Sequence, residues 1–128
     1  MKFWIVSMEC AGIAEAGGVK NVSFSLCKEL ALLGHQVTLF IPFFKCTSFK
    51  IIEKLEEKGL ETQIQICGKE ESLQYKKAVC TQGNFNIVFV CHPAFEEKEG
   101  VYTYTASEQE KNPDFVKGFG HKDTPFMD

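Results

Sequence analysis

Two adjacent glycines, Gly17 and Gly18, separate an apolar segment from a long amphipathic segment near the start of the chain. Residues 3–7 form an apolar run that predicts a buried strand, and residues 19–33 have the periodicity of a helix. Backbone N–H groups at the start of a helix, with the positive end of its dipole, favour a phosphate or a sugar hydroxyl. The sequence therefore predicts a ligand-binding edge at this junction.

A second strand follows the helix closely. Gly34 stands where a left-handed helix cap is expected, and residues 36–42 are rich in β-branched and aromatic side chains. Strand, helix and strand in this order indicate two parallel strands joined by a crossover helix. Apolar residues at steps of three and four predict the face of the helix that packs on the sheet: Val22, Leu26, Leu30 and Leu33.

The remaining segments predict an α/β fold of the Rossmann-like kind, a parallel sheet with flanking helices. We expect a short helix over residues 49–58, an antiparallel hairpin near residues 60–81, and a third buried parallel strand over residues 85–91. Beyond residue 93 the polar and Gly-interrupted sequence predicts loop with one short helix. Three parallel strands and one covering helix are half of a doubly wound domain, so we expect a truncated, amino-terminal part of one.

Composition excludes several classes of function. The 128 residues carry a net charge of −3 with scattered lysines and no arginine, which argues against nucleic-acid and membrane-surface binding. With no signal peptide and no apolar run of the ~20 residues that span a bilayer, we expect a cytoplasmic protein. The six cysteines lack C-x-x-C spacing, which predicts reduced, structural thiols and no metal site.

The glycines fit neither of the common phosphate-binding motifs. Gly12 and Gly17 have Walker A spacing, but Gly18 and Val19 stand where that loop needs lysine and a hydroxyl residue. The dinucleotide fingerprint fails as well, because Gly17 and Gly18 are adjacent and Asn21 occupies the helix-packing glycine position.

A longer pattern does match a known family. The order of strand, Ser-x-Glu, Gly-Gly-Val, helix, Gly-His-x-Val, strand and Pro is similar to the amino terminus of glycogen and starch synthases. The resemblance is strong over residues 3–42 and weaker to about residue 95. The elements that carry it are Val6-Ser7-Met8-Glu9, Glu15-Ala16-Gly17-Gly18-Val19, Leu32-Leu33-Gly34-His35-Gln36-Val37 and Ile41-Pro42.

The resemblance implies a GT-B glycosyltransferase, in which two Rossmann-like domains face a cleft. Such enzymes transfer glucose from ADP-glucose to an α-1,4-glucan with retention, without a cofactor. Residues 1–128 would be part of the amino-terminal domain, and the carboxy-terminal nucleotide-sugar-binding domain would be absent from this chain. The catalytic residues are then expected outside these residues, so the fragment alone should be inactive.

The resemblance also implies that the Gly17–Gly18 loop contacts the donor. The family places a lysine near the donor diphosphate, whereas this chain has Glu15 in that position. Three outcomes are open: Lys20 compensates, the donor differs, or Glu15 binds ribose or sugar hydroxyls; we favour the last two. The expected donor-binding residues are Glu15, Gly17 and Gly18, and the candidate cleft residues are Glu9, Lys20 and His92.

Simpler interpretations stay open. Gly17 and Gly18 are also compatible with a tight helix entry, and Glu9 with a solvated loop carboxylate. The missing arginines leave room for a non-catalytic α/β module that binds a nucleotide sugar or a glucan. A different GT-B transferase, such as a sucrose or glycosyl-phospholipid enzyme, would share the Gly-Gly and Gly-His-x-Val elements.

Overall fold

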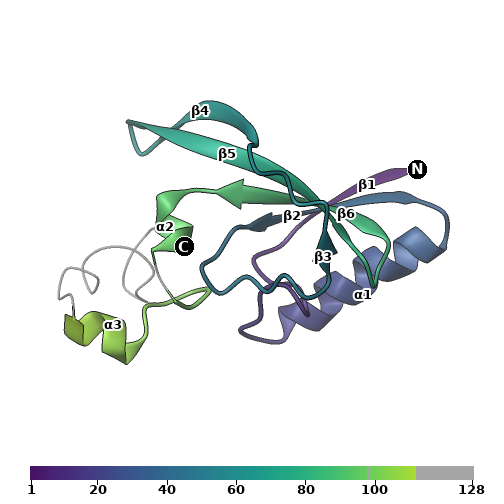
Figure 1. Cartoon of the computed structure of the whole chain (residues 1–128), viewed down its shortest axis with the longest axis horizontal. Coiled ribbons are helices and arrows are strands. Elements are labelled where there is room, and N and C mark those ends of the chain that lie inside the picture. Colours follow the sequence, from purple (N-terminus) through teal and green to yellow (C-terminus); the bar gives the residue numbers. More distant parts are fainter. Residues whose placement is uncertain (98, 112–128) are drawn as a thin grey trace.

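A mixed β-sheet with one long helix on its face forms the main body of the computed structural model (Figure 1). The structure describes residues 1–97 and 99–111. In chain order its elements are β1 (Lys2–Val6), α1 (Val19–Leu32), β2 (Gln36–Pro42), β3 (Ile52–Glu53), β4 (Leu60–Ile66), β5 (Lys69–Cys80), β6 (Phe85–Cys91), α2 (Pro93–Glu96) and α3 (Ala106–Lys111).

Three strands form a parallel layer in the order β1-β2-β6. Ile5 pairs with Leu39, and Leu39 pairs with Ile87 on its other side. Leu39 and Ile87 are fully buried, as expected for a parallel strand that is covered on the core side. The prediction that residues 85–91 return to the parallel sheet is confirmed.

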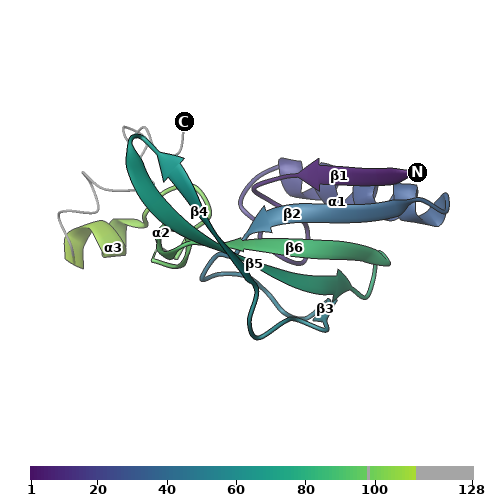
Figure 2. The ribbon, with the colours of Figure 1, turned by 90° about the horizontal axis from the view of Figure 1, so that it is seen from above.

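The other half of the sheet is antiparallel. β5 pairs with β6, and β4 and β5 form a hairpin that projects beyond the parallel layer (Figure 2). Cys67 and Gly68 connect the hairpin strands with φ angles of 52° and 75°. Positive φ at both central residues is typical of a type I′ turn, whose twist matches that of the strands and fixes the register. The predicted hairpin near residues 60–81 is confirmed.

Helix α1 packs on the sheet through a face that the periodicity did not identify. Its buried residues are Ser23 and Cys27, whereas Leu33 is 72% exposed. Val22 and Leu26 are also exposed, and of the predicted face only Leu30 packs against the core. The prediction of that face was wrong in its other three members, because Phe24, whose ring contacts Phe85, and Ala31 pack against the core instead.

Residues 49–58 do not form the predicted helix. Ile52 and Glu53 are instead the short strand β3, which pairs with β5. Farther along, the Glu56 carboxylate accepts the N–H of Lys77 at 2.9 Å, and the Glu56 N–H donates to the Lys77 carbonyl. The backbone of this segment therefore pairs with the long strand β5, and this tertiary pairing outweighs a weak helical periodicity.

The segment after β6 contains two short helices, α2 and α3, where the sequence predicted one. The rest of that predicted loop, residues 112–128, lies outside the described residues.

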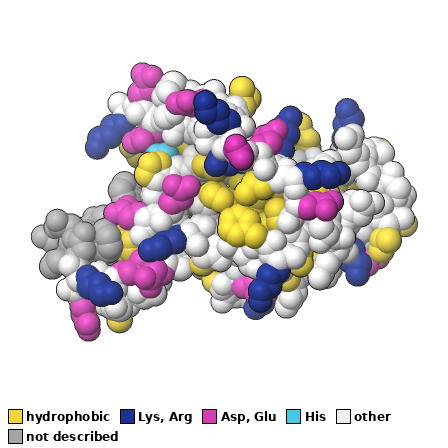
Figure 3. All heavy atoms as spheres, in the orientation of Figure 1, with side chains coloured by type: hydrophobic (Ala, Val, Ile, Leu, Met, Phe, Trp, Pro, Cys, Tyr) yellow, Lys and Arg dark blue, Asp and Glu magenta, His cyan; other side chains and the backbone are white. Residues whose placement is uncertain are grey.

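Apolar side chains remain exposed on β1, the strand at one end of the sheet order. Trp4 is 77% exposed and Val6 is 82% exposed. On the face seen in Figure 3, further hydrophobic side chains gather near the middle, surrounded by charged ones. Parallel sheets are normally covered on both faces, so the described residues leave part of this sheet without its usual cover.

Candidate functional site

The loop between β1 and α1 consists of a buried half and an exposed half. In the buried half, Cys10 and Ala14 bond each other through both backbone groups, and Ile13 is 1% exposed. Gly12 has a φ of +79°, and a Cβ there would lie 2.7 Å from Cδ1 of Ile51. Gly12 is therefore required by the fold itself, and the exposed half that follows rests on a rigid base.

Gly17 and Gly18 belong to the exposed half, and the fold gives no comparable reason for either glycine. Gly18 has a φ of −82° and a ψ of −23°, a conformation open to any residue. A Cβ at Gly18 would meet no atom of the described residues within 4 Å, and one at Gly17 would make ordinary contacts with the Glu9 carboxylate. Gly18 is the N-cap of α1, a position where glycine is tolerated, and the space beside it is open.

Glu9 does not lie in the solvent-facing part of this site, where the sequence had placed it as a candidate cleft residue. Its side chain is 1% exposed, and its carboxylate accepts the N–H of Ala16 at 2.6 Å and the N–H of Gly17. The interpretation of Glu9 as a solvated loop carboxylate is wrong. The two N–H groups that Glu9 occupies belong to the loop, because Ala16 and Gly17 precede the N-cap residue Gly18. Among the described residues, no side chain caps the first turn of α1.

Glu15 and Lys20 form an ion pair beside the glycines. The Lys20 ammonium lies 3.6 Å from a carboxylate oxygen of Glu15, and the two side chains are 32% and 50% exposed. This pairing is compatible with the first of the three outcomes, in which Lys20 compensates for Glu15, and the outcomes that we favour from the sequence stay predictions. The backbone ties the same region together, since the Ala11 N–H donates to the Lys20 carbonyl at 3.0 Å.

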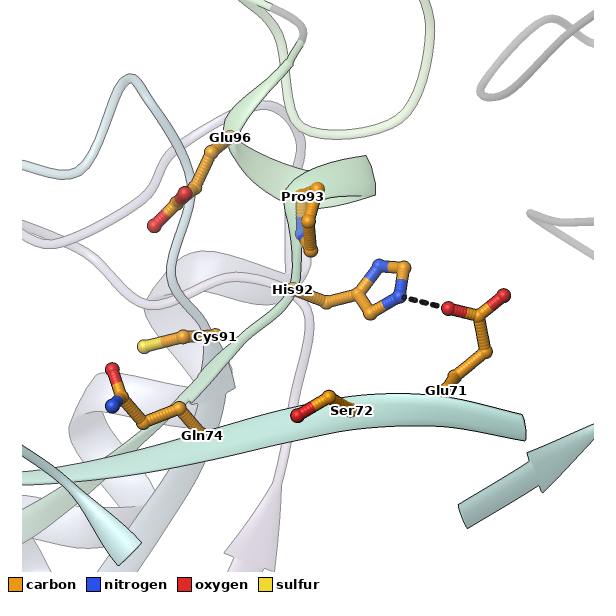
Figure 4. A pocket seen from close by; sticks show the side chains of 7 residues that line it. All are labelled: Glu71, Ser72, Gln74, Cys91, His92, Pro93 and Glu96. Atoms are coloured by element: carbon orange, nitrogen blue, oxygen red, sulfur yellow. Dashed lines mark hydrogen bonds and ion pairs between the residues drawn. The ribbon is translucent and has the colours of Figure 1, made fainter. Parts of the chain in front are cut away.

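His92 lies beside a hollow of about 350 Å³ at the carboxyl end of β6 (Figure 4). Its Nδ1 accepts the N–H of Ala94 at 3.1 Å and so caps α2, while its Nε2 lies 3.1 Å from the Glu71 carboxylate. The proton therefore resides on Nε2, which donates to Glu71. The hollow is lined by Glu71, Ser72, Gln74, Cys91, His92, Pro93 and Glu96.

The sequence identified His92 but missed Glu71, its partner across the hollow. In Figure 4 the two side chains point toward each other from β5 and from the end of β6. Only the antiparallel register of these strands brings them together, and no local motif marks Glu71.

The Gly17–Gly18 loop and the hollow beside His92 share one edge of the sheet, because both follow carboxyl ends of parallel strands. β2 separates the strands β1 and β6 that lead to them, so these strands lie about 10 Å apart, or two strand spacings. Ligands of open α/β sheets collect at this edge. Gly18 and His92 thus lie along the same edge of the sheet, Gly18 in the loop before α1 and His92 in the hollow after β6.

The buried cysteines are unsuited to nucleophilic chemistry. Burial raises the pKa of Cys10 to about 12 and that of Cys27 to about 11, with neighbouring thiols adding to both shifts.

Within residues 1–97 and 99–111, no group of three or more His, Cys, Asp or Glu side chains is arranged to hold a metal ion. In the same residues, every helix is too short or too polar to cross a bilayer.

The chain is similar in sequence to starch and glycogen synthases. The sequence pattern described as "Starch synthase catalytic domain" matches residues 2–122. A glycogen synthase of Hydrogenobaculum sp. is 47% identical over 60 residues, which cover 47% of this chain and 12% of that protein. The soluble starch synthase 2-1 of rice, Oryza sativa subsp. japonica, is 28% identical over 95 residues, or 74% of this chain and 12% of its own length.

A solved structure shows the same fold. The catalytic domain of starch synthase IV from Arabidopsis thaliana bound to ADP and acarbose superposes with a TM-score of 0.68 at 20% identity, over 88% of this chain and 23% of that one. The present chain thus spans a minor part of each of these proteins.

Proposed function

The chain belongs to the starch synthase catalytic domain family, and we propose that it is the amino-terminal part of a glycogen or starch synthase-type hexosyltransferase. The proposed reaction transfers glucose from a nucleotide sugar, ADP-glucose, to an α-1,4-glucan. The choice of donor is supported by the ADP bound to the starch synthase IV structure.

Gly18 is the observation that carries this proposal. It stands at the start of α1, at the ligand-binding edge of the sheet, in a conformation that any residue adopts. The space beside it is free of the described atoms. Serine, threonine, asparagine or aspartate would cap α1 at least as well as glycine, so a residue without a side chain here is consistent with a ligand that needs the space. We assign Gly17, Gly18 and the flanking Glu15 to donor binding, with Lys20 offsetting the charge of Glu15.

Part of the transferase lies beyond these residues in this proposal. The exposed Trp4 and Val6 on β1 would be covered by further strands and helices of the same polypeptide. A second, nucleotide-sugar-binding domain would supply the cationic groups that stabilise the leaving diphosphate, because this chain has no arginine. We place the catalytic residues there and the protein in the cytoplasm.

The test is transfer of labelled glucose from ADP-glucose to glycogen by the full-length protein. We expect transfer by the unmodified protein and a loss of at least about 100-fold in the Gly18→Val variant, because a side chain would displace the donor. Full activity of that variant with unchanged donor KM would show that the loop does not hold the donor. A parent protein without transfer from any nucleotide glucose would reject the activity.

A non-catalytic binding module is the second candidate, favoured by the missing arginines and by Glu15 in the lysine position. Calorimetry on the 128-residue chain separates the two. A Kd of about 100 μM or tighter for ADP-glucose or a maltooligosaccharide would support a self-sufficient module. Absence of binding by the chain, together with turnover by the full-length protein, would support part of an enzyme.

A further inference from the structure

Glu9 is an unusual residue for the interior of a small sheet domain. Its side chain is 1% exposed, although a buried carboxylate is costly unless hydrogen bonds or opposite charges compensate it. The compensation comes from the loop itself, since the N–H groups of Ala16 and Gly17 both point at one oxygen, Oε1. Successive N–H groups of this kind form a small anion-binding concavity. The anion in this concavity is Glu9.

The backbone of Glu9 is fixed from another side. The Ser7 hydroxyl donates to the Glu9 carbonyl at 2.8 Å and accepts the Glu9 N–H at 3.2 Å. The same hydroxyl lies 2.8 Å from that of Ser23, which is one of the two buried residues of α1. Glu9 is thus held to the end of β1 and to the buried face of α1, while its carboxylate holds the exposed loop between them.

Tyr102, from the segment before α3, also meets Glu9. Partial burial raises the pKa of the Tyr102 phenol, and a hydrogen bond to Glu9 and the negative charge of Glu9 raise it further. The phenol therefore reports on the charge of Glu9 in a way that can be measured without any ligand.

We propose that Glu9 is a positioning residue for the donor loop: its carboxylate acts as an internal anion that fixes Ala16 and Gly17 and so keeps the open side of Gly18 toward the ligand. This inference rests on the proposed function of the Gly17–Gly18 loop. It implies that the donor is not bound by the N–H groups of Ala16 and Gly17, which Glu9 occupies, and that Glu9 itself does not touch the donor.

The first experiment needs no activity and uses the 128-residue chain. In Glu9→Gln, an amide oxygen replaces the carboxylate, so we expect the amide proton resonances of Ala16 and Gly17 to move upfield and the pKa of Tyr102 to fall. The matched control is Glu57→Gln, which alters an exposed glutamate and should change neither. Unchanged resonances and an unchanged Tyr102 titration in Glu9→Gln would overturn the anchoring.

Unmodified protein provides a second measurement in case Glu9→Gln does not fold. The amide protons of Ala16 and Gly17 should exchange with solvent more slowly than amides of exposed loop residues without a hydrogen bond, because both donate to Glu9. Equally fast exchange would overturn the proposal.

The functional half of the test uses the full-length protein. We expect Glu9→Gln and Glu9→Asp to raise the KM for ADP-glucose at least tenfold, with a smaller change in kcat, because the loop is less well fixed but the chemistry lies elsewhere. A KM within twofold of the unmodified value would reject the positioning role. Gly18→Val distinguishes the two proposals: if it abolishes transfer while Glu9→Gln leaves KM unchanged, only the inference about Glu9 fails.

Discussion

The ammonium group of Lys20 lies 3.6 Å from the carboxylate of Glu15, directly beside the two glycines that begin α1. The pair is partly exposed, so its contribution to stability is small, about 0.2–1 kcal/mol. In the proposed donor site, the pair offsets the negative charge that Glu15 brings to the position where the family has lysine.

Reversing the charge of Glu15 tests whether this residue faces the donor diphosphate. We expect Glu15→Lys to bind ADP-glucose about fivefold more tightly, equivalent to about 1 kcal/mol, because a repulsive charge becomes an attractive one. Calorimetry or the donor KM measures the change, and Glu29→Lys, on an exposed position of α1, controls for net charge. Unchanged affinity would mean that Glu15 does not face the diphosphate.

Gly34 is the matched control for the effect of Gly18→Val on stability. Gly34 follows α1 with a φ of +87°, so Gly34→Val should destabilise the fold by about 1–3 kcal/mol through backbone strain. Gly18→Val should cost less, about 0.5–1 kcal/mol, because the space at Gly18 is open and only the N-cap preference is lost. Strong destabilisation by Gly18→Val would show that this glycine serves the fold.

Two leucines of α1 test which face of the helix is buried. Leu30 packs against the core, whereas Leu33 is 72% exposed. We expect Leu30→Ala to lower the free energy of unfolding by about 2 kcal/mol and Leu33→Ala to change it by less than about 0.5 kcal/mol. Equal effects in urea denaturation would contradict the orientation of the helix.

Glu108 makes the segment around α3 sensitive to acid. Burial alone would raise its pKa, but the N–H groups of Thr105 and Glu99, the Thr105 hydroxyl and the charge of Lys45 together lower it. Because the pKa of Glu108 is lower in the folded state, the carboxylate stabilises the fold at pH values above the ordinary pKa of a glutamate. This stabilisation is lost as the pH falls through the pKa of the folded state.

Hydrogen exchange at the Thr105 and Glu99 amides follows this effect. Glu108→Gln should reduce their protection at neutral pH by about fivefold, corresponding to ~1 kcal/mol, and the difference from the unmodified chain should vanish in acid. Glu110→Gln, an exposed glutamate of the same helix, serves as the control. A difference that persists unchanged at pH 2 would contradict the assignment.

Alkylation tests the prediction of reduced, structural cysteines. Cys67, exposed at the hairpin turn, should react first, followed by Cys46, whose pKa is raised by partial burial. Cys10 and Cys27 should stay unmodified until the chain unfolds, because they are buried and their pKa values are about 12 and 11. Mass spectrometry after limited labelling gives the order, and early labelling of Cys10 would contradict the packing of the loop.

Local sequence was sufficient for the elements whose cause is local. Residues 36–42 and 85–91 are short runs of apolar and β-branched side chains, which favour a buried strand. The alternation of polar and apolar residues over 61–67 predicted a strand of the hairpin, whereas the turn places Cys67, a residue that rarely adopts positive φ, at a φ of 52°. The ordered elements from Val6 to Pro42 identified the family.

Contacts between distant residues decided the rest, because their energies depend on which segments meet. The buried face of α1 is set by the side chains that meet the core, among them Phe24, Cys27 and Leu30. Residues 49–58 form no helix because part of this segment pairs with β5. Periodicity describes one segment at a time and carries no information about such partners. Likewise the sequence placed Glu9 near the loop, but only the tertiary structure turned its carboxylate inward onto Ala16 and Gly17.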